Sequence, residues 1–423
     1  MMTQILLKNG QVYQERQLVP GDLLIVDGKI AAIGEHLEQP GQTVIDLTGK
    51  VILPGLVDVH VHFRDPGQTA KETVATGSAA AVQGGYTTVC AMPNVTPVPN
   101  TPAQLAKMVQ ANQEQGKVSV LQYAPVTVDE TTEQLVDFAG MQAAGAIGFS
   151  NDGVGIQSAK TMYDAMVGIA KTGLPLAAHV EDHALMAGGV INAGPRAQAL
   201  GLPGAVSVAE TSQLARDLEL ARVTGVHYHV CHVSTARSVE LIRRAKADGI
   251  HVTAEVSPHH LLLNDEMIQA DDPLFKMNPP LRASTDAQAL LAGLQDGTID
   301  MIATDHAPHT KADKGTSFTD GAFGITGLET AFPLLYTKLV APGTVSLADL
   351  LDWMSFNPSR IFSLPTAPKL HVGSVANLSL WDLEADRQLT VHDLRSKGTN
   401  TPFLGTHVVA EHVNTICAGQ VVD

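Results

Sequence analysis

Residues 55–67 read GLVDVHVHFRDPG, and the fold of the chain is decided around them. They close an apolar run, VILPGLVDVHVHF (51–63), that predicts a buried strand. His60 and His62 occupy alternate positions, so an extended strand turns both imidazoles to one face. Imidazole is the commonest side-chain ligand for metals and suits Zn²⁺. Paired histidines also occur in ordinary strands, so a metal site here depends on what the rest of the chain supplies.

A strand-then-helix rhythm begins at residue 51 and repeats about eight times over roughly 300 residues. Apolar strands that alternate with amphipathic helices predict βαβ units and a parallel sheet. Eight such units are typical of a TIM-type (β/α)8 barrel. We therefore expect an α/β protein whose barrel covers residues 51–365. The predicted strands are YTTVCAMPN, VSVLQYAPVT, AIGFSND, PLAAHVED, VHYHVCHVS, IHVTAEVSPHH and IDMIATDHAPH, after the first strand that ends at His60.

Both ends of the chain lack this rhythm and contain short strands instead. Residues 1–50 carry the hairpin-turn dipeptides Asn9-Gly10 and Asp27-Gly28. Strand patterns return in the tail, as KLHVGSVANLSLWDL and HVVAEHVNTICAGQVVD. We expect residues 1–50 and 366–423 to build one small β-sandwich beside the barrel, with two separate β appendages as the alternative.

Composition narrows the class of function. The formal net charge of the 423 residues is −16, which argues against nucleic acid or an anionic membrane as a partner. A small anionic substrate is still compatible, because local arginines outweigh net charge inside a site. The three cysteines form no CxxC pair, and no apolar run resembles a signal peptide or a membrane span, so we expect a cytoplasmic protein.

Residues able to bind a metal recur where the predicted strands end. The active sites of such barrels lie at this rim. Four imidazoles and two carboxylates make a nitrogen and oxygen set that suits one or two Zn²⁺ ions. Arg64 stands beside the first pair, at the same rim. The set consists of His60, His62, Asp152, His179, His232 and Asp305, and Asn94 ends the second strand.

Eight motifs along the chain resemble those of the bacterial type I dihydroorotases, in the amidohydrolase superfamily. They are DVHVHFRDPG (58–67), AMPN (91–94), GFSNDG (148–153), AHVED (178–182), HVCHVST (229–235), KMNPPLR (276–282), ATDHAPH (303–309) and GAFGITGLET (321–330). The resemblance covers essentially the whole chain. One departure is Val180, where relatives often carry cysteine; it is not a ligand position.

The resemblance implies reversible, zinc-dependent cyclisation of N-carbamoyl-L-aspartate to L-dihydroorotate in de novo pyrimidine (UMP) biosynthesis. Two Zn²⁺ per chain are implied: His60, His62 and Asp305 would hold one, His179 and His232 the other, with Asp152 between them. Asp305 would act as general base and then as general acid. The implied substrate contacts are His62, Arg64, Asn94, Asn278 and His309, with the backbone of Phe323 and Gly324.

The resemblance also suggests partners and rivals. A homodimer is expected, and association with aspartate transcarbamoylase is a further expectation. One alternative is another cyclic amidohydrolase, an allantoinase or a hydantoinase, which usually bridges its metals with a carboxylated lysine at the end of strand four. This chain has Asp152 there and no lysine between Lys117 and Lys160. The other alternative is a non-catalytic scaffold, which would typically have lost ligands.

Most of the 17 histidines are not expected to bind metal. We interpret His227 and His229 as buried structural residues, His259 and His260 as scaffold, and His183 and His251 as surface residues. On an extended strand His306 would face away from Asp305. The polar segment TKADKGTSFTD (310–320) is expected to be a mobile loop over the rim, with a plain surface loop as the alternative.

Overall fold

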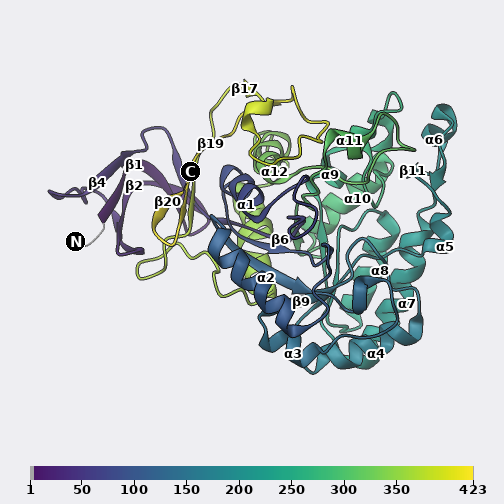
Figure 1. The fold of residues 1–423 in the computed structure, drawn as a ribbon. Helices are drawn as coiled ribbons and strands as arrows, with labels where there is room; N and C mark the ends of the chain where they lie inside the picture. The colour runs from purple at the N-terminus through teal and green to yellow at the C-terminus, as the bar shows by residue number, and fades with distance from the viewer. Residues whose placement is uncertain (1–3, 423) are drawn as a thin grey trace.

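In the computed structural model, which describes residues 4–422, eight parallel strands form a nearly closed barrel (Figure 1). The (β/α)8 prediction is confirmed. A bridge from Val61 to His306, with the His62 N–H donating to the His306 carbonyl at 2.9 Å, joins the first strand to the chain after the last. In sheet order the strands are β15 (Met301–Ile302), β14 (Val252–Val256), β13 (Tyr228–Val230), β10 (Leu176–Ala178), β9 (Ala146–Ser150), β8 (Ser119–Ala124), β7 (Tyr86–Ala91) and β6 (Leu56–Val61).

Amphipathic helices follow the strands and pack their apolar sides into the main core. In α8, for example, Val239, Ile242 and Ala245 are buried, whereas Arg243 and Arg244 face solvent. No helix in the described part of the chain has the length and hydropathy that a bilayer crossing requires. The principal helices are α1 (Val74–Gln83), α2 (Pro102–Gln115), α3 (Phe138–Ala143), α4 (Ala159–Ala170), α7 (Val208–Thr224), α8 (Ala236–Ala247), α10 (Ser284–Gln295) and α12 (Leu328–Leu335).

Shorter elements fill the loops at the rim and the connections between units. An insertion after β10 carries two helical turns and a two-stranded ribbon. It comprises α5 (His183–Met186), β11 (Ile191–Asn192), α6 (Pro195–Leu200) and β12 (Gly204–Ala205). The other short elements are η1 (Val128–Glu130), α9 (Pro258–Leu262), η2 (Asp265–Met267), η3 (Pro273–Phe275), α11 (Lys311–Lys314), η4 (Tyr336–Val340), α13 (Leu347–Leu351), η5 (Asp352–Phe356), α14 (Asn357–Ile361) and η6 (Val391–Asp393).

Strands from both chain ends combine beside the barrel in one mixed sheet, where a small β-sandwich was expected (Figure 1). Its order is β20-β19-β16-β5-β1-β2-β3, with β4 paired to β1. Trp381 of β16 is fully buried and packs on Phe332 of α12, which fastens the sheet to the barrel. The strands are β1 (Gln4–Gln14), β2 (Gln17–Val26), β3 (Lys29–Gly34), β4 (Thr43–Asp46), β5 (Val51–Pro54), β16 (Leu378–Asp382), β19 (Glu411–Cys417) and β20 (Gln420–Val422); β17 (Arg387–Gln388) pairs with β18 (His407–Val408).

Two local predictions are wrong. Asn9-Gly10 makes no hairpin: β1 runs through it with a shift of register, and the Asn9 N–H donates to Asp22 on the paired strand at 2.9 Å. A bulge, like a hairpin, uses the positive φ of Asn9 (61°), so the dipeptide alone does not distinguish them. The segment TTEQLVDFAGMQAAG (131–145) also predicts a helix over its whole length, but the helix begins only at Phe138, where the Asp137 side chain caps it.

Candidate functional site

The first metal-binding group comes from the ends of β6 and β15, which lie side by side at the closure of the barrel. His62 Nε2 is 3.1 Å and His60 Nε2 is 3.5 Å from the same carboxylate oxygen, Asp305 Oδ1. Both imidazoles also approach Asp152, His60 at 3.3 Å from Oδ1 and His62 at 3.3 Å from Oδ2. The alternate positions of the two histidines therefore do place both rings on one face.

The second group comes from β10 and β13, on the other side of Asp152. His232 Nε2 lies 3.5 Å and His179 Nδ1 4.0 Å from Asp152 Oδ1, and the two imidazole nitrogens are 2.9 Å apart. Asp152 thus sits between the two histidine pairs, with an oxygen toward each ring of the first pair. All six predicted metal ligands are buried and converge on one site.

The distances between the donor atoms suit a shared metal ion better than hydrogen bonds between the side chains. Two ligands at about 2.0–2.1 Å from a tetrahedral Zn²⁺ lie roughly 3.3 Å apart, which matches most of these separations. Among the described residues, His60 Nε2 and Asp152 Oδ1 are buried without a hydrogen-bond partner. Buried polar atoms normally find a partner, so these two atoms indicate a place for a cation. His60, His62 and Asp305 form one such set; Asp152, His179 and His232 form the other.

Electrostatics favour a cation at the same place. Burial alone would lower the pKa of His60, but the carboxylates of Asp152 and Glu255 outweigh it and raise the pKa well above its usual value. Burial alone would raise the pKa of Asp152, yet His60 and its neighbours hold it well below the usual range. Asp305 is shifted the same way, chiefly by His62 against its own burial. Both carboxylates therefore stay ionised in the buried site.

A layer of buried acids behind the histidines was not foreseen as part of the site. Glu255, in the middle of the seventh barrel strand, accepts from His60 Nδ1 at 2.6 Å and from His229 Nε2 at 3.1 Å. Asp58 accepts from the backbone N–H groups of His60 and Thr304 at 3.0 and 3.1 Å. Such outer partners fix the tautomer and orientation of a metal-binding histidine. The available signal was a carboxylate inside each apolar strand, in LVDVHV and VTAEV.

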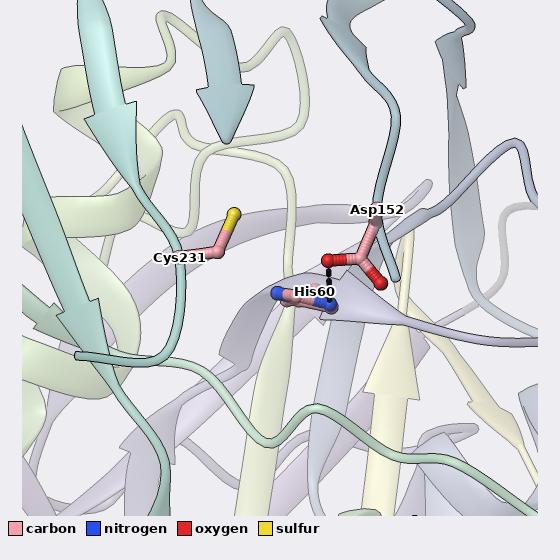
Figure 2. A group of neighbouring side chains, drawn as sticks. All are labelled: His60, Asp152 and Cys231. Carbon is pink, nitrogen blue, oxygen red and sulfur yellow. Dashed lines mark ion pairs between the residues drawn. The ribbon is translucent and has the colours of Figure 1, made fainter. Parts of the chain in front are cut away.

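Cys231 is a further donor beside this cluster. Figure 2 shows His60 with Asp152 and Cys231 around it, and the donor atoms of the three lie within 4.8 Å of one another. Burial raises the pKa of the Cys231 thiol far above its usual value, with the Glu255 carboxylate adding to the effect. A thiol binds metals as the thiolate, so its protonated form leaves the carboxylates and imidazoles as the better ligand set.

The cluster forms the floor of a cleft of about 230 Å³. Arg64, which follows the first strand, lines it together with Asn278 from the loop after α9. The predicted contacts are all present at its wall: His62, Arg64, Asn94, Asn278, His309, Phe323 and Gly324. The volume suits a small polar molecule. Whether each residue touches a substrate stays a prediction.

Several of these residues already have partners within the protein, among them Asn94 and Asn278. The Asn94 side-chain oxygen accepts from His62 Nδ1 at 2.9 Å, so Asn94 orients a metal-binding ring. Asn278 donates to Glu181 at 2.6 Å, and Glu181 also lies 3.4 Å from His179 Nε2. Burial would raise the pKa of Glu181, but its contact with His179 prevails and lowers it to about 2. Glu181 is thus another residue of the site that the sequence analysis missed.

Three residues of the site have positive φ angles although none is glycine. They are Arg64 (58°), His232 (34°) and Asp305 (51°), each in the segment that follows a barrel strand. This region of backbone space costs a non-glycine residue about 1–3 kcal/mol and persists only where its surroundings enforce it. The chain therefore turns sharply as each strand ends, at the rim where the cleft lies.

The remaining histidines lie largely where they were expected. His227 and His229 are buried, and His251 is exposed and stacks on His227. His183 is exposed, although its Nε2 lies 3.6 Å from Glu181. His306 faces away from the cluster, since its Nδ1 accepts from the Gly327 N–H at 3.1 Å.

The pair after the seventh strand, which was interpreted as scaffold, is buried on α9. His260 Nδ1 lies 2.8 Å from Ser257 Oγ, and its Nε2 donates to the Pro279 carbonyl at 3.0 Å. His259 stacks on Phe403 with ring centroids 6.0 Å apart. Burial lowers the pKa of His259 to about 4 and that of His260 to about 3, so both rings are neutral at pH 7.

The polar segment at residues 310–320 is partly ordered by its own side chains. Thr310 and Asp313 form a capping box that starts α11, and Lys314 at the end of this helix is buried. Residues 322–324, just beyond the segment, line the cleft. No residue of the segment itself lines the cleft, so its place over the rim and its movement both stay predictions.

Comparisons with known proteins agree with this geometry. A family model described as "Dihydro-orotase-like" matches residues 49–238. A dihydroorotase of Pediococcus pentosaceus is 56% identical over 418 residues, which cover 99% of this chain and 98% of that protein. One of Lactiplantibacillus plantarum is 56% identical over 98% of this chain and 97% of its own. The solved L-hydantoinase (dihydropyrimidinase) of Arthrobacter aurescens superposes with a TM-score of 0.88 at 28% identity, covering 100% of this chain and 96% of that one.

The Glu255–His60 hydrogen bond gives a testable prediction. Glu255→Gln should lower the affinity for Zn²⁺ by about 10- to 100-fold, because the amide keeps the shape but loses the charge that supports His60. Competition with a chromophoric chelator measures this without any activity assay. The matched control is Glu219→Gln on the exposed face of α7, which should leave the Zn²⁺ affinity unchanged. Unaltered affinity in Glu255→Gln would show that His60 needs no such support.

Proposed function

The chain belongs to the dihydroorotase family, and on that premise we propose that it interconverts N-carbamoyl-L-aspartate and L-dihydroorotate through the cleft described above. It is a hydrolase that acts on cyclic amides. In biosynthesis the useful direction is ring closure, toward UMP. The observation that carries the proposal is the convergence of six buried ligand residues under a small cleft that also holds an arginine.

Zinc is the metal that best suits the donor set, and we propose two ions per chain. His60, His62 and Asp305 would hold one, His179 and His232 the other, with Asp152 shared. Zn²⁺ held there would supply Lewis acidity, which polarises a carbonyl group and lowers the pKa of water. The position of Asp152 supports sharing, because its Oδ2 lies 3.3 Å from His62 of the first set and its Oδ1 lies 3.5 Å from His232 of the second.

We assign substrate binding to the charged and hydrogen-bonding side chains in the wall of the cleft. The free carboxylate of the substrate needs a charged partner, and the Arg64 guanidinium can bind it through two parallel hydrogen bonds. Arg64 Nε is buried without a hydrogen-bond partner among the described residues, so the protein leaves that donor unused. Asn278 Oδ1 and His309 Nδ1 are likewise buried without a hydrogen-bond partner among the described residues. These orphaned atoms support the predicted contacts.

Asp305 is placed to move the proton. In ring opening it would take a proton from the attacking water and pass it to the leaving ring nitrogen; ring closure runs the same steps in reverse. Its Oδ1 lies 3.1 Å from His62 Nε2 and its pKa is held low, so the group is an ionised base at neutral pH. The attacking water and the leaving nitrogen would both lie within hydrogen-bond reach of this carboxylate.

The rival activities have less support. The sequence identity to the L-hydantoinase is 28%, whereas the identity to the dihydroorotase of Pediococcus pentosaceus is 56%, and both values cover nearly the whole chain. Strand β9 and the turn after it contain no lysine that could be carboxylated, and Asp152 stands there instead. A non-catalytic scaffold is disfavoured because every expected ligand is present and converges.

A cytoplasmic location and two kinds of partner complete the proposal. Cys90 and Cys231 are free and buried, and Cys417 is free and partly buried, which suits a reducing compartment. A homodimer and an association with aspartate transcarbamoylase are carried over from the family resemblance alone.

Turnover and metal analysis of the same sample test the proposal directly. The purified protein should interconvert carbamoyl-aspartate and dihydroorotate, leave hydantoin and allantoin untouched, and carry close to two Zn²⁺ per chain. Metal-free protein should regain activity with Zn²⁺ in CO₂-free buffer. A requirement for bicarbonate would instead indicate a carbamate bridge, and faster turnover of hydantoin or allantoin would favour the rivals.

The proton-transfer role of Asp305 predicts a specific kinetic defect. Asp305→Asn should lower kcat by about 10²–10⁴-fold while changing substrate affinity far less, because an amide cannot shuttle the proton. Zn²⁺ content must be measured in parallel, since Asp305 is also a proposed ligand. Asp164→Asn on the surface of α4 is the control. Near-normal kcat in Asp305→Asn would remove the role.

The carboxylate-binding role of Arg64 predicts the opposite pattern. Arg64→Met keeps the length and the apolar stem but loses the charged hydrogen bonds, which are worth about 10- to 100-fold in affinity. KM should rise by that factor for both carbamoyl-aspartate and dihydroorotate. The exposed Arg237→Met serves as control. Unchanged KM for both substrates would place Arg64 outside the binding site.

A further inference from the structure

The ammonium group of Lys314 is buried behind the wall of the cleft and donates to three backbone carbonyls. Lys314 ends α11 and is 4% exposed. Its Nζ donates to the carbonyl oxygens of Lys276 at 3.1 Å, Ala322 at 2.9 Å and Gly324 at 3.0 Å. Lysine is almost never buried in this way without a reason, because its long side chain normally reaches water.

Lys276, itself buried, completes the same arrangement from the opposite side. Its Nζ donates to the Gly321 carbonyl at 2.6 Å and lies 4.2 Å from the centre of the Phe323 ring. Its own carbonyl accepts from the Gly324 N–H at 3.0 Å. The loop before Asn278 and the segment after α11 are therefore tied together through two ammonium groups and one backbone hydrogen bond.

The consequence is that four successive carbonyls, at residues 321–324, all point to protein donors. Lys276 and Lys314 take three of them, and His309 Nε2 donates to the Phe323 carbonyl at 2.8 Å. None of these bonds uses the Phe323 N–H. Gly324 adopts a φ of 133°, and a Cβ there would lie 2.7 Å from Ala307 Cβ, so a side chain would not fit at this position. These bonds hold the backbone in the wall of the cleft. They leave the Phe323 N–H unused and fix the direction in which it points.

The protonation state of Lys314 matters for this geometry. Three acceptors match the three hydrogens of an ammonium group, whereas a neutral amine offers only two. Burial and the neighbouring Lys276 cation lower the pKa of Lys314 to about 7, so the carbonyls must offset part of the cost of the charge. Asn400 gives a second, uncharged support by donating to the Gly324 carbonyl at 3.0 Å.

We propose that Lys314 is a positioning residue for substrate binding, which ties α11 to the Phe323–Gly324 backbone and so fixes the N–H that binds a substrate oxygen. The proposal rests on the proposed function. Lys314 acts through the backbone and touches no substrate. It also gives the 310–320 segment a role: any movement of that segment would shift the wall of the cleft.

Lys314→Met tests this inference in the full-length, zinc-loaded protein. KM for carbamoyl-aspartate and dihydroorotate should rise at least about tenfold, because three carbonyls lose a charged donor, while kcat stays within about threefold. Amide hydrogen exchange in peptides that cover residues 318–326 should become faster. The matched control is Lys311→Met, on the same helix but exposed, which should leave both measurements unchanged.

Lys314→Gln guards against a folding defect, because its amide restores two donors without the charge. It should show a KM between those of the wild type and Lys314→Met. Wild-type KM in a folded Lys314→Met would overturn the inference. So would a loss of thermal stability and kcat together in both variants with no change in KM, since that pattern marks a merely structural residue. Wild-type protein that turns over neither substrate would instead refute the proposed function itself.

Discussion

Two carboxylates and four imidazoles share a buried volume only a few ångströms across, and this crowding is the constraint on which the rest of the structure depends. Asp152 lies within 4.0 Å of nitrogen atoms from all four rings. Buried charge is costly unless it is paired, and an imidazole cluster without a cation would leave donor atoms such as His60 Nε2 unsatisfied. A dication resolves both costs at once, so the cluster is best understood as a site built for metal.

Holding that cluster together is the work of residues that never reach the cleft. Glu255 spans from His60 to His229, and Asp58 accepts hydrogen bonds from two neighbouring strands. These acids lie within the parallel strands and fix the imidazole rings from the barrel interior. The sharp backbone turns at Arg64 and Asp305 shape the rim at the ends of the strands. The barrel therefore orients the residues of the cluster in two ways. Side chains in its interior hold the imidazole rings, and the backbone conformation at its edge directs the residues of the rim.

The wall of the cleft is built from segments that lie far apart in the sequence. Asn400, from the C-terminal region, donates to the carbonyls of Ala307 and Gly324, and its side-chain oxygen accepts from the His309 N–H. The C-terminal region thus contributes to the site as well as to the end sheet. Lys276 and Lys314 add buried positive charge on the same side. In a protein of net charge −16, this local excess of cations suits an anionic substrate.

The sequence by itself determined the barrel, the rim and the convergence of the six candidate ligand residues, because each depends on short-range periodicity. Alternation places His60 and His62 on one face, and strand ends in a parallel barrel must share a rim. Tertiary structure alone decided that Asn9-Gly10 forms a bulge, that Glu255 supports His60, and that Lys314 is buried. These outcomes depend on contacts between residues distant in sequence, whose geometry is fixed only when strands and loops have packed.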